Sequence, residues 1–273
     1  MTACEWACLV NTTVTVLSAV KDRALGLQSP YGRYSNARPS RSAEPRFELR
    51  ADLPVPARLA WFLMEAPNLV LGGAVAAAAA ASGRGDAHAW IVVGMFMLHY
   101  AARTLVYSAL IRGGKPMPLL ILALGATFTA VNGFVQTYHH LFDVQPSPVP
   151  RQGFWGIVWV AARIVGFAVF AFGMFLNHYA DHVLRTLRKS DEDRAYYIPR
   201  GPFFDVLVAP NLVGEIVEWL GYAVFANTYV AWGFAVSTAF TVGNRALGHK
   251  AFYVDKFKDE FPRNRWALVP GVV

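Results

Sequence analysis

The chain alternates long apolar runs with short polar segments. Each apolar run extends for about 20 residues, the length that crosses a bilayer as a helix, whereas a buried strand of a soluble domain needs about 4–8 residues. The sequence therefore predicts an all-α, multi-pass integral membrane protein, with residues 1–273 forming a single membrane domain. We expect seven transmembrane helices, at 3–20, 59–81, 88–111, 117–138, 153–178, 203–226 and 229–247.

Polar segments divide this single domain. The first span is only weakly hydrophobic, because its apolar run contains threonines and Asn11. The expected divisions are the weak first span at 3–20, a connector at 21–58, spans two to seven at 59–248, and a tail at 249–273.

Lysine and arginine are distributed unevenly between the two sides of the predicted bundle. The connector 21–58 and the tail 249–273 are rich in these residues, and the alternate loops on the opposite side contain only Arg84 and Arg151. Because cytosolic loops carry an excess of basic residues, this asymmetry places the connector and the C-terminus in the cytosol and the N-terminus outside it.

The composition agrees with a membrane protein and excludes other classes. The chain is 55% hydrophobic and 16% charged, and its net charge of +7 comes from the loops, so nucleic-acid binding is not indicated. Cys4 and Cys8, four residues apart, fit helix packing better than a disulfide, and no metal-ligand spacing occurs. The chain lacks the glycine motifs of a Rossmann domain and of a P-loop. A dinucleotide would therefore bind among the membrane helices.

The stretch 209–222 places an amide and two carboxylates inside an apolar segment. Asn211, Glu215, Glu218 and Tyr222 are spaced so that they form one polar stripe on a helix. A charged side chain at the centre of a membrane helix costs roughly 2.5–3.5 kcal/mol, so this stripe must face a polar environment. Both a network between helices and a pocket for a polar ligand satisfy that requirement.

Three further polar stripes fall near the same predicted cytosolic face. Taken singly, each has a structural explanation, such as a solvated ion pair or anchoring at the membrane interface. Taken together, they favour a pocket for a ligand with several phosphates, because arginine offers phosphate two donors at once. The three stripes are Asn177, Asp181, Arg185 and Arg188; Arg245, His249 and Tyr253; and Tyr100, Arg103 and Tyr107.

Several long motifs resemble one family and follow each other in its order. In the C-terminal half, the runs YYIPRG at 196–201, NLVGEIVEWLGYA at 211–223 and ALVP at 267–270 are similar to steroid 5α-reductases. Upstream, the runs PARLAWFLMEAP at 56–67 and HYAARTLVYS at 99–108 are similar to the same family. With the YGR run in the connector, the resemblance to the 3-oxo-5α-steroid 4-dehydrogenases extends from about residue 31 to the end.

The resemblance implies an enzyme of the endoplasmic-reticulum, or microsomal, membrane. It would be a monomer among membrane lipids, with a cytosolic C-terminus, and would use NADPH to reduce the Δ4 double bond of a 3-oxo steroid. Glu65 and Tyr100 match the pair that hydrogen-bonds the substrate carbonyl. The positions that match cofactor-binding residues are Trp61, Lys115, Asn177, Asp181, Arg188, Tyr196, Asn211, Glu215, Arg245, His249 and Tyr253.

This reaction requires these residue types on chemical grounds. Hydride delivery to the β-carbon of an enone builds negative charge on the carbonyl oxygen, so a donor must lie at that oxygen. The Tyr100 phenol is such a donor. Glu65 either donates as a second, protonated group or, when ionised, orients Tyr100 as an acceptor. We expect Asn211 and Glu215 to hold the nicotinamide carboxamide, and we expect Glu218 to connect helices outside the site.

Three positions depart from the family pattern. Lys115 replaces an arginine, which keeps the charge but loses the two-pronged donor. Met64 replaces a glutamine beside Glu65, and Leu124 replaces an arginine. These departures leave a related reductase of a lipid enone, of the trans-2-enoyl-CoA or polyprenol type, as the main alternative. A membrane methyltransferase and a transporter or receptor with a polar core are further alternatives.

Overall fold

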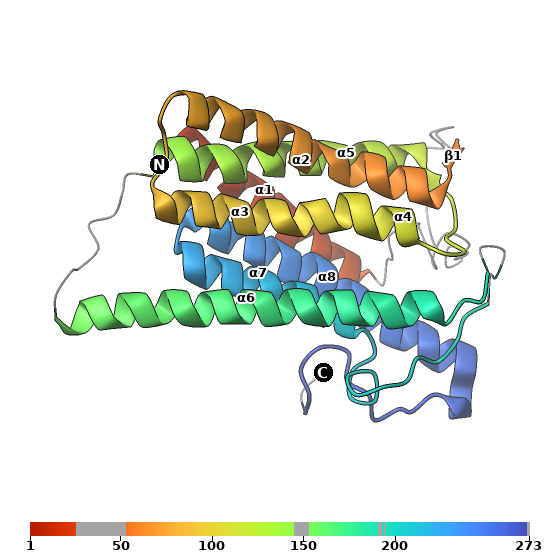
Figure 1. Cartoon of the computed structure of the whole chain (residues 1–273). Helices are drawn as coiled ribbons and strands as arrows, with labels where there is room; N and C mark the ends of the chain where they lie inside the picture. Colours follow the sequence, from red (N-terminus) through yellow and green to blue (C-terminus); the bar gives the residue numbers. More distant parts are fainter. Residues whose placement is uncertain (26–52, 145–152, 191–192, 194, 272–273) are drawn as a thin grey trace.

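The protein is a bundle of long helices that run roughly parallel and antiparallel to one another (Figure 1). The computed structural model describes residues 1–25, 53–144, 153–190, 193 and 195–271. Most of the predicted connector 21–58 thus lies outside the described residues. The main helices are α1 (Ala3–Ala24), α2 (Ala57–Ala81), α3 (Ala87–Ala101), α5 (Leu119–Tyr138), α6 (Phe154–Thr186), α7 (Pro210–Ala226) and α8 (Tyr229–Phe257).

Short elements complete the described parts of the chain. The π-helical turn η2 (Ala102–Tyr107) and α4 (Ser108–Leu110) continue α3, and a second π-helical turn, η3 (His139–Asp143), continues α5. The 3-10 turn η4 (Lys258–Glu260) follows α8. Two strands of two residues, β1 (Pro54–Val55) and β2 (Met117–Pro118), pair antiparallel and hold the starts of α2 and α5 together.

Local sequence signals explain where several helices begin. The side chain of Thr2 caps α1 and forms a capping box with Glu5, and the side chains of Asp86 and Thr228 cap α3 and α8. Each side chain accepts a bond from a backbone N–H that has no partner in the first helical turn. These caps fix the starts of α1, α3 and α8.

Three predicted boundaries differ from the structure by seven or more residues. The sixth predicted span starts at 203, but α7 begins at Pro210, because the preceding residues form a turn in which Leu207 bridges to Trp266. Proline fits the first helical turn, because backbone N–H groups there have no partner within the helix and the one that proline lacks is not needed. The fifth and seventh helices are longer than the predicted spans and end at Thr186 and Phe257.

Five helices in the described parts of the chain are long and apolar enough to cross a membrane. They are Ala3–Ala24, Ala57–Ala81, Ala87–Leu110, Leu119–Asp143 and Phe154–Thr186. The protein is therefore a helical, multi-pass membrane protein. Neither α7, which has 17 residues, nor α8 is among these five, so the predicted total of seven spans stays a prediction.

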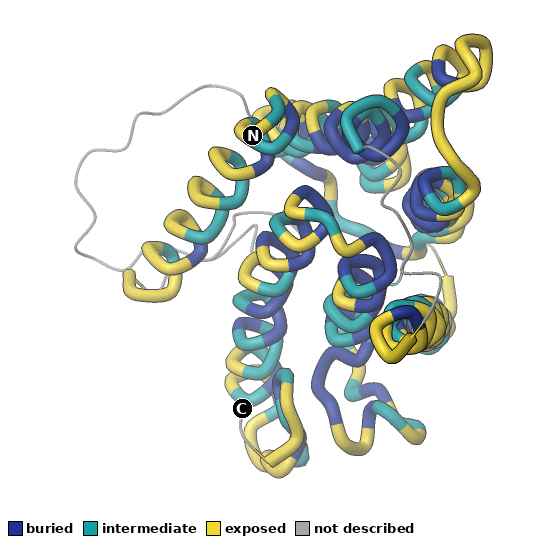
Figure 2. Tube along the Cα trace, turned by 90° about the vertical axis from the view of Figure 1, so that its left-hand side faces the viewer, coloured by how far each residue is buried: buried dark blue, intermediate teal, exposed yellow. Residues whose placement is uncertain are grey.

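The helices turn their buried residues toward each other (Figure 2). Many of the residues exposed on the outside are large and apolar. The main core cluster joins α3, α6, α7 and α8, and its large members include Phe96, Trp219, Tyr222 and Phe234. On α6, large apolar side chains such as Phe154, Trp155, Ile157 and Ile164 are exposed. An exposed apolar surface of this kind suits a helix that faces lipid.

Glycines bring the backbones of α6 and α7 into direct contact. A Cβ atom added at Gly166 would lie 2.6 Å from the backbone nitrogen of Phe225, and one added at Gly214 would lie 2.6 Å from that of Asn177. Small residues allow membrane helices to approach this closely. As a result, the polar end of α6 lies directly beside the polar beginning of α7.

Candidate active site

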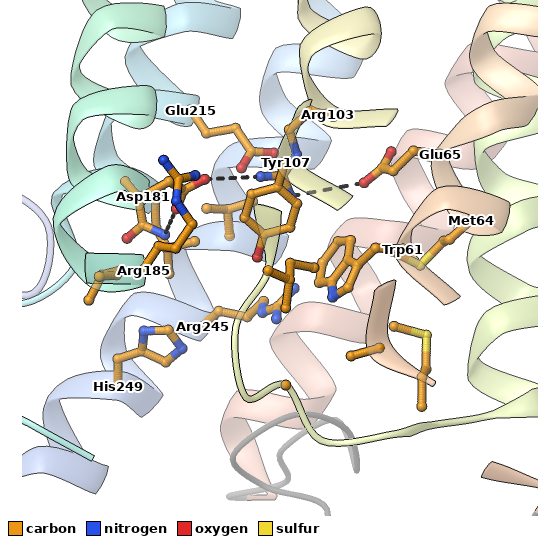
Figure 3. A pocket seen from close by; sticks show the side chains of 18 of the residues that line it. Trp61, Met64, Glu65, Arg103, Tyr107, Asp181, Arg185, Glu215, Arg245 and His249 are labelled. Atoms are coloured by element: carbon orange, nitrogen blue, oxygen red, sulfur yellow. Dashed lines mark hydrogen bonds and ion pairs between the residues drawn. The ribbon is translucent and has the colours of Figure 1, made fainter. Parts of the chain in front are cut away.

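A cavity of about 530 Å³ lies among the helices (Figure 3). Its lining residues come from the end of the bundle where α2 and α7 begin, an end that can be followed in Figure 1. Its wall is formed by six helices, by the segment after α4 and by the segment around 195–197. Twelve of the thirteen residues predicted for the site line it: Trp61, Glu65, Tyr100, Lys115, Asp181, Arg188, Tyr196, Asn211, Glu215, Arg245, His249 and Tyr253. The structure thus brings four separate polar stripes to one cavity, and their individual roles stay predictions.

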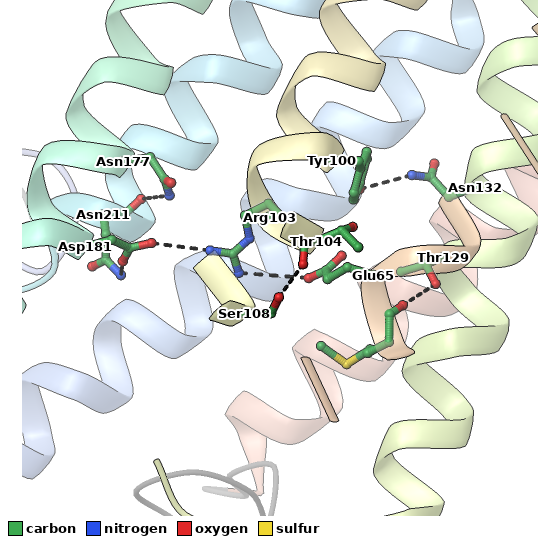
Figure 4. Close-up of polar contacts among 11 residues, drawn as sticks. Glu65, Tyr100, Arg103, Thr104, Ser108, Thr129, Asn132, Asn177, Asp181 and Asn211 are labelled. Atoms are coloured by element: carbon green, nitrogen blue, oxygen red, sulfur yellow. Dashed lines mark hydrogen bonds and ion pairs between the residues drawn. The ribbon is translucent and has the colours of Figure 1, made fainter. Parts of the chain in front are cut away.

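Tyr100 and Glu65 lie in the buried part of the cavity wall. The side-chain amide of Asn132 donates a hydrogen bond to the Tyr100 hydroxyl oxygen over 3.3 Å (Figure 4). The Glu65 carboxylate lies 3.9 Å from the Arg103 guanidinium. The cavity therefore contains a phenol whose oxygen is already an acceptor and a carboxylate that faces a cation.

Arg103 connects the two halves of the cavity. Its Nη1 atom lies 3.4 Å from Asp181 Oδ2 on α6, and its other terminal nitrogen faces Glu65 on α2 (Figure 4). The guanidinium also lies over the rings of Tyr107 and Trp61, at 4.2 and 5.3 Å from their centroids. The two carboxylates and the two aromatic rings stabilise the buried guanidinium, because carboxylates neutralise a cation and aromatic faces attract it.

The π-helical turn η2 places Arg103 and Tyr107 in this position. A π-helical turn is wider than an α-helical turn and occurs often at functional sites. The turn η2 directs Arg103 and Tyr107 into the cavity that Tyr100 also lines. The sequence pattern grouped these three residues, but Arg103 and Tyr107 were not assigned to the site. The signal that could have identified them is this stripe of polar residues deep within a predicted span.

A short polar chain joins α6 to α7 at the cavity wall. The amide of Asn211 donates to Asp181 Oδ1 over 3.0 Å, and the amide of Asn177 donates to the backbone oxygen of Asn211 over 2.9 Å. Asn177 is buried and is the one predicted site residue outside the cavity lining, so it contacts the site through Asn211. Among the described residues, the side-chain oxygen of Asn211 has no hydrogen-bond partner. The same oxygen is buried, so Asn211 faces the cavity with other atoms of the residue.

Cationic residues gather in another part of the same wall. Arg112, Lys115, Arg185, Arg188 and Arg245 all line the cavity, together with His249, and they come from three separate segments of the chain. Arg185 is a cavity residue that the assignment from sequence omitted. This concentration of positive charge favours an anionic ligand, and arginine in particular favours phosphate.

The segment that carries Tyr196 is held by an exposed carboxylate. Asp193 accepts bonds from the backbone N–H groups of Ala195 and Lys189, over 3.0 and 3.2 Å, and from the Tyr197 hydroxyl over 3.1 Å. The bond from Ala195 contributes most to a pKa of Asp193 below its usual value, and the bond to Asp193 raises the pKa of Tyr197. These contacts position the Tyr196 segment beside the cationic wall.

The departures from the family pattern differ in their relation to the cavity. Met64 lines the cavity, and the backbone oxygen of Met64 accepts a bond from Thr129. Leu124 lies on the outer surface of α5, where its side chain is 60% exposed, and is not a lining residue. The Leu124 substitution thus leaves the cavity wall unchanged, whereas Met64 forms part of it.

Glu218 lies outside the cavity and connects two helices. Its carboxylate is fully buried, and one of its oxygens lies 2.8 Å from Nδ1 of His99 on α3. His99 in turn packs its ring against Tyr100 and Trp219. The acidic stripe on α7 is therefore divided: Glu215 lines the cavity, and Glu218 ties α7 to α3.

Comparison with known proteins gives relatives of nearly the same length. The 3-oxo-5-alpha-steroid 4-dehydrogenase 1 of Bos taurus is 37% identical over 250 residues, which cover 90% of this chain and 88% of the relative. The Homo sapiens protein of the same name is 36% identical over 240 residues, which cover 87% of each chain. The 3-oxo-5-alpha-steroid 4-dehydrogenase 2 of Sus scrofa is 36% identical over 258 residues, which cover 94% and 93%.

The fold and the cavity define a multi-pass membrane protein with a cavity lined by polar residues among its helices. A family profile described as 3-oxo-5-alpha-steroid 4-dehydrogenase matches residues 115–273. The chain belongs to this family, whose members are oxidoreductases that act on CH–CH groups. The resemblance inferred from the motifs is thereby confirmed, and the methyltransferase and transporter alternatives are set aside.

Proposed function

We propose that this protein uses NADPH to reduce the Δ4 double bond of a 3-oxo-Δ4-steroid to the 5α-steroid. The observation that carries the proposal is one continuous cavity with two kinds of wall. Tyr100 and Glu65 supply the polar groups that a substrate carbonyl needs, and five cationic residues supply the charge that a phosphorylated cofactor needs. The names of the relatives, which specify 3-oxo-5-alpha-steroid 4-dehydrogenases, support this substrate class.

The residues of the cavity fit a nicotinamide dinucleotide. Asn211 and Glu215 both line the cavity, and a carboxamide bound beside them would meet an amide and a carboxylate that can exchange hydrogen bonds with it. Arg188, Arg245 and Lys115 would hold phosphate groups, with the two arginines able to donate two bonds each. NADPH held there would supply a hydride to C5 of the steroid.

The side chains of this protein would stabilise the charge that builds on the C3 oxygen. Tyr100 donates a hydrogen bond to that oxygen, and such a preorganised donor is most effective in a site that excludes water. The Arg103 guanidinium, next to Glu65, contributes positive charge to the same region. The enolate then takes a proton from solvent at C4 and the C3 carbonyl forms again, which completes the reduction of the C4–C5 bond. In this scheme Tyr100 and Glu65 are the catalytic residues.

The test is reduction by the purified protein in detergent micelles. We expect NADPH oxidation that depends on a 3-oxo-Δ4-steroid, with a 5α-steroid as the product identified by mass spectrometry. A panel containing a trans-2-enoyl-CoA and a polyprenol-type enone is measured in parallel. Reduction of one of these substrates without reduction of any steroid would overturn the substrate assignment and keep the reductase assignment.

One observation favours the related lipid-enone reductase as the second candidate. Met64 places a thioether in the cavity wall where the family has a glutamine, so the wall beside Glu65 offers one fewer polar group. A less polar wall suits a substrate with fewer polar groups near its carbonyl. Replacing Met64→Gln should then raise activity on steroids relative to activity on the other enones.

A further inference from the structure

Asn132 lies behind Tyr100, on the face of α5 that points into the bundle. Its side chain is 5% exposed, and its amide nitrogen lies 3.3 Å from the Tyr100 hydroxyl oxygen, which it faces across the gap between α5 and α3 (Figure 4). Asn132 does not line the large cavity, so it does not contact a ligand bound there. Any effect of Asn132 on the reaction must therefore pass through Tyr100 or through the packing of α5.

The hydrogen bond from Asn132 determines what the Tyr100 hydroxyl can do. A phenol has one proton and accepts bonds through its oxygen, whereas an amide NH₂ only donates. Because the NH₂ of Asn132 occupies the acceptor side of the phenol, the Tyr100 proton must point elsewhere. Accepting a bond also polarises the O–H group and strengthens the bond that it donates. Tyr100 is thus prepared as a donor toward the cavity.

The Tyr100 ring is held in place by other aromatic rings. Its centroid lies 4.7 Å from that of Phe96 and 5.9 Å from that of Trp219, and the His99 ring packs against its edge at 5.0 Å. These contacts restrict the ring, so the remaining freedom of the hydroxyl is rotation about its C–O bond. Asn132 restricts that rotation.

The position of Asn132 is in turn fixed relative to the helix that carries Glu65. A Cβ atom added at Gly133 would lie 2.7 Å from the Cα atom of Asn68, so the backbones of α5 and α2 touch at this level. One turn earlier, the Thr129 hydroxyl donates to the backbone oxygen of Met64 over 2.5 Å. Contacts on both sides of Asn132 therefore hold α5 against α2.

We infer that Asn132 is a positioning residue that orients the Tyr100 hydroxyl as a donor to the substrate carbonyl. This inference rests on the proposed function. It assigns Asn132 no contact with the substrate or the cofactor. Its loss should therefore lower kcat through Tyr100 and leave NADPH binding unchanged.

The test is a double-mutant cycle with Asn132→Ala and Tyr100→Phe. We expect Asn132→Ala to lower kcat about 10-fold, the scale of one lost hydrogen bond, with the Kd for NADPH unchanged. In the Tyr100→Phe protein, the same substitution should have no further effect, because the hydroxyl on which it acts is absent. An equal loss in both backgrounds would show a structural role for Asn132 and overturn the inference.

Two further variants keep the result interpretable. Asn132→Asp preserves the shape of the side chain but replaces its donor with an acceptor, so it should lower kcat more than Asn132→Ala. If the Asn132→Ala protein does not fold, the Asn132→Asp protein tests the inference in its place. Thr127→Ala, on the exposed face of α5, is the matched control and should retain wild-type kcat. A wild-type kcat in both Asn132 variants would overturn the inference and leave the proposed function intact. A wild-type protein that reduces no 3-oxo-Δ4-steroid would overturn the proposed function and the inference with it.

Discussion

Arg103 and Asp181 form a buried ion pair, with Nη1 3.4 Å from Oδ2, between the π-helical turn of the third span and α6. The same guanidinium faces Glu65 at 3.9 Å. A single cation thus lies between the carboxylate of the proposed substrate half of the cavity and the carboxylate that orients Asn211. The two halves of the site are therefore electrostatically connected.

We expect Arg103→Met to lower the stability of the protein, because it leaves the Glu65 and Asp181 carboxylates without their shared cation. Removing one partner of a buried ion pair costs about 3–5 kcal/mol. Adding Asp181→Asn should recover part of that loss by removing one of the two unpaired charges. Thermal unfolding in detergent measures both effects. An Arg103→Met protein with wild-type stability would show that the pair does not stabilise the fold.

Tyr100→Phe should lower turnover by about 10²–10³-fold, the effect of removing one donor to a developing oxyanion. Binding of NADPH should be unchanged, because the substitution removes only the hydroxyl. Tyr138→Phe is the matched control, since Tyr138 stacks on Phe134 and Phe142 away from the cavity. Steady-state kinetics together with an NADPH titration separate the two quantities. Wild-type turnover in the Tyr100 variant would remove Tyr100 from the proposed mechanism.

Glu215→Gln and Arg188→Ala should each weaken NADPH binding by about 10-fold, the scale of one lost hydrogen bond to a polar ligand group. Arg188 also donates to the backbone oxygen of Arg112, so Arg188→Ala is compared with Arg188→Lys, which keeps the charge. Arg84→Ala, an exposed residue on the loop between α2 and α3, is the control. Fluorescence titration with NADPH gives the Kd values. Equal values for all proteins would make these side chains structural.

Gly133→Ala should destabilise the protein by about 1–3 kcal/mol, the usual range for adding an atom to a packed interface. The added Cβ atom would meet backbone atoms of Asn68, which cannot move without separating α5 from α2. Gly94→Ala is the matched control, because a Cβ atom there has no neighbour within 4 Å. Thermal unfolding of the two variants makes the comparison. Equal stability of both would mean that the α2–α5 contact is adaptable.

The topology proposed from the charge distribution has α7 and α8 as the sixth and seventh spans and the C-terminus in the cytosol. The family resemblance adds the proposal that the membrane is that of the endoplasmic reticulum. A membrane-impermeant maleimide applied to intact microsomes should therefore label Glu260→Cys and leave Arg84→Cys unlabelled until the membrane is permeabilised. Both positions are exposed, and the native Cys4 and Cys8 are buried. The opposite labelling pattern would reverse the proposed orientation.

The pattern of the sequence anticipated the helical class and most of the site. Apolar runs of helical length predicted all seven long helices. Polar stripes at helical spacing, together with the family resemblance, predicted twelve residues that line the cavity. Such predictions succeed because helical periodicity and the energetic penalty of polar groups in lipid are local properties of the chain. The start of α7 was misplaced, because the turn before it depends on a bridge to the distant Trp266.

The sequence by itself determined the membrane class, the family and the set of polar residues that had to avoid lipid. The tertiary structure decided which of those residues face the cavity and which face one another. It placed Arg103 between Glu65 and Asp181, Asn132 behind Tyr100, and Asn177 and Glu218 outside the cavity wall. Such pairings depend on the distance and rotation between helices, which glycine contacts such as Gly133 against Asn68 set. Hydrophobic periodicity specifies a face of a helix, and only packing specifies its partner.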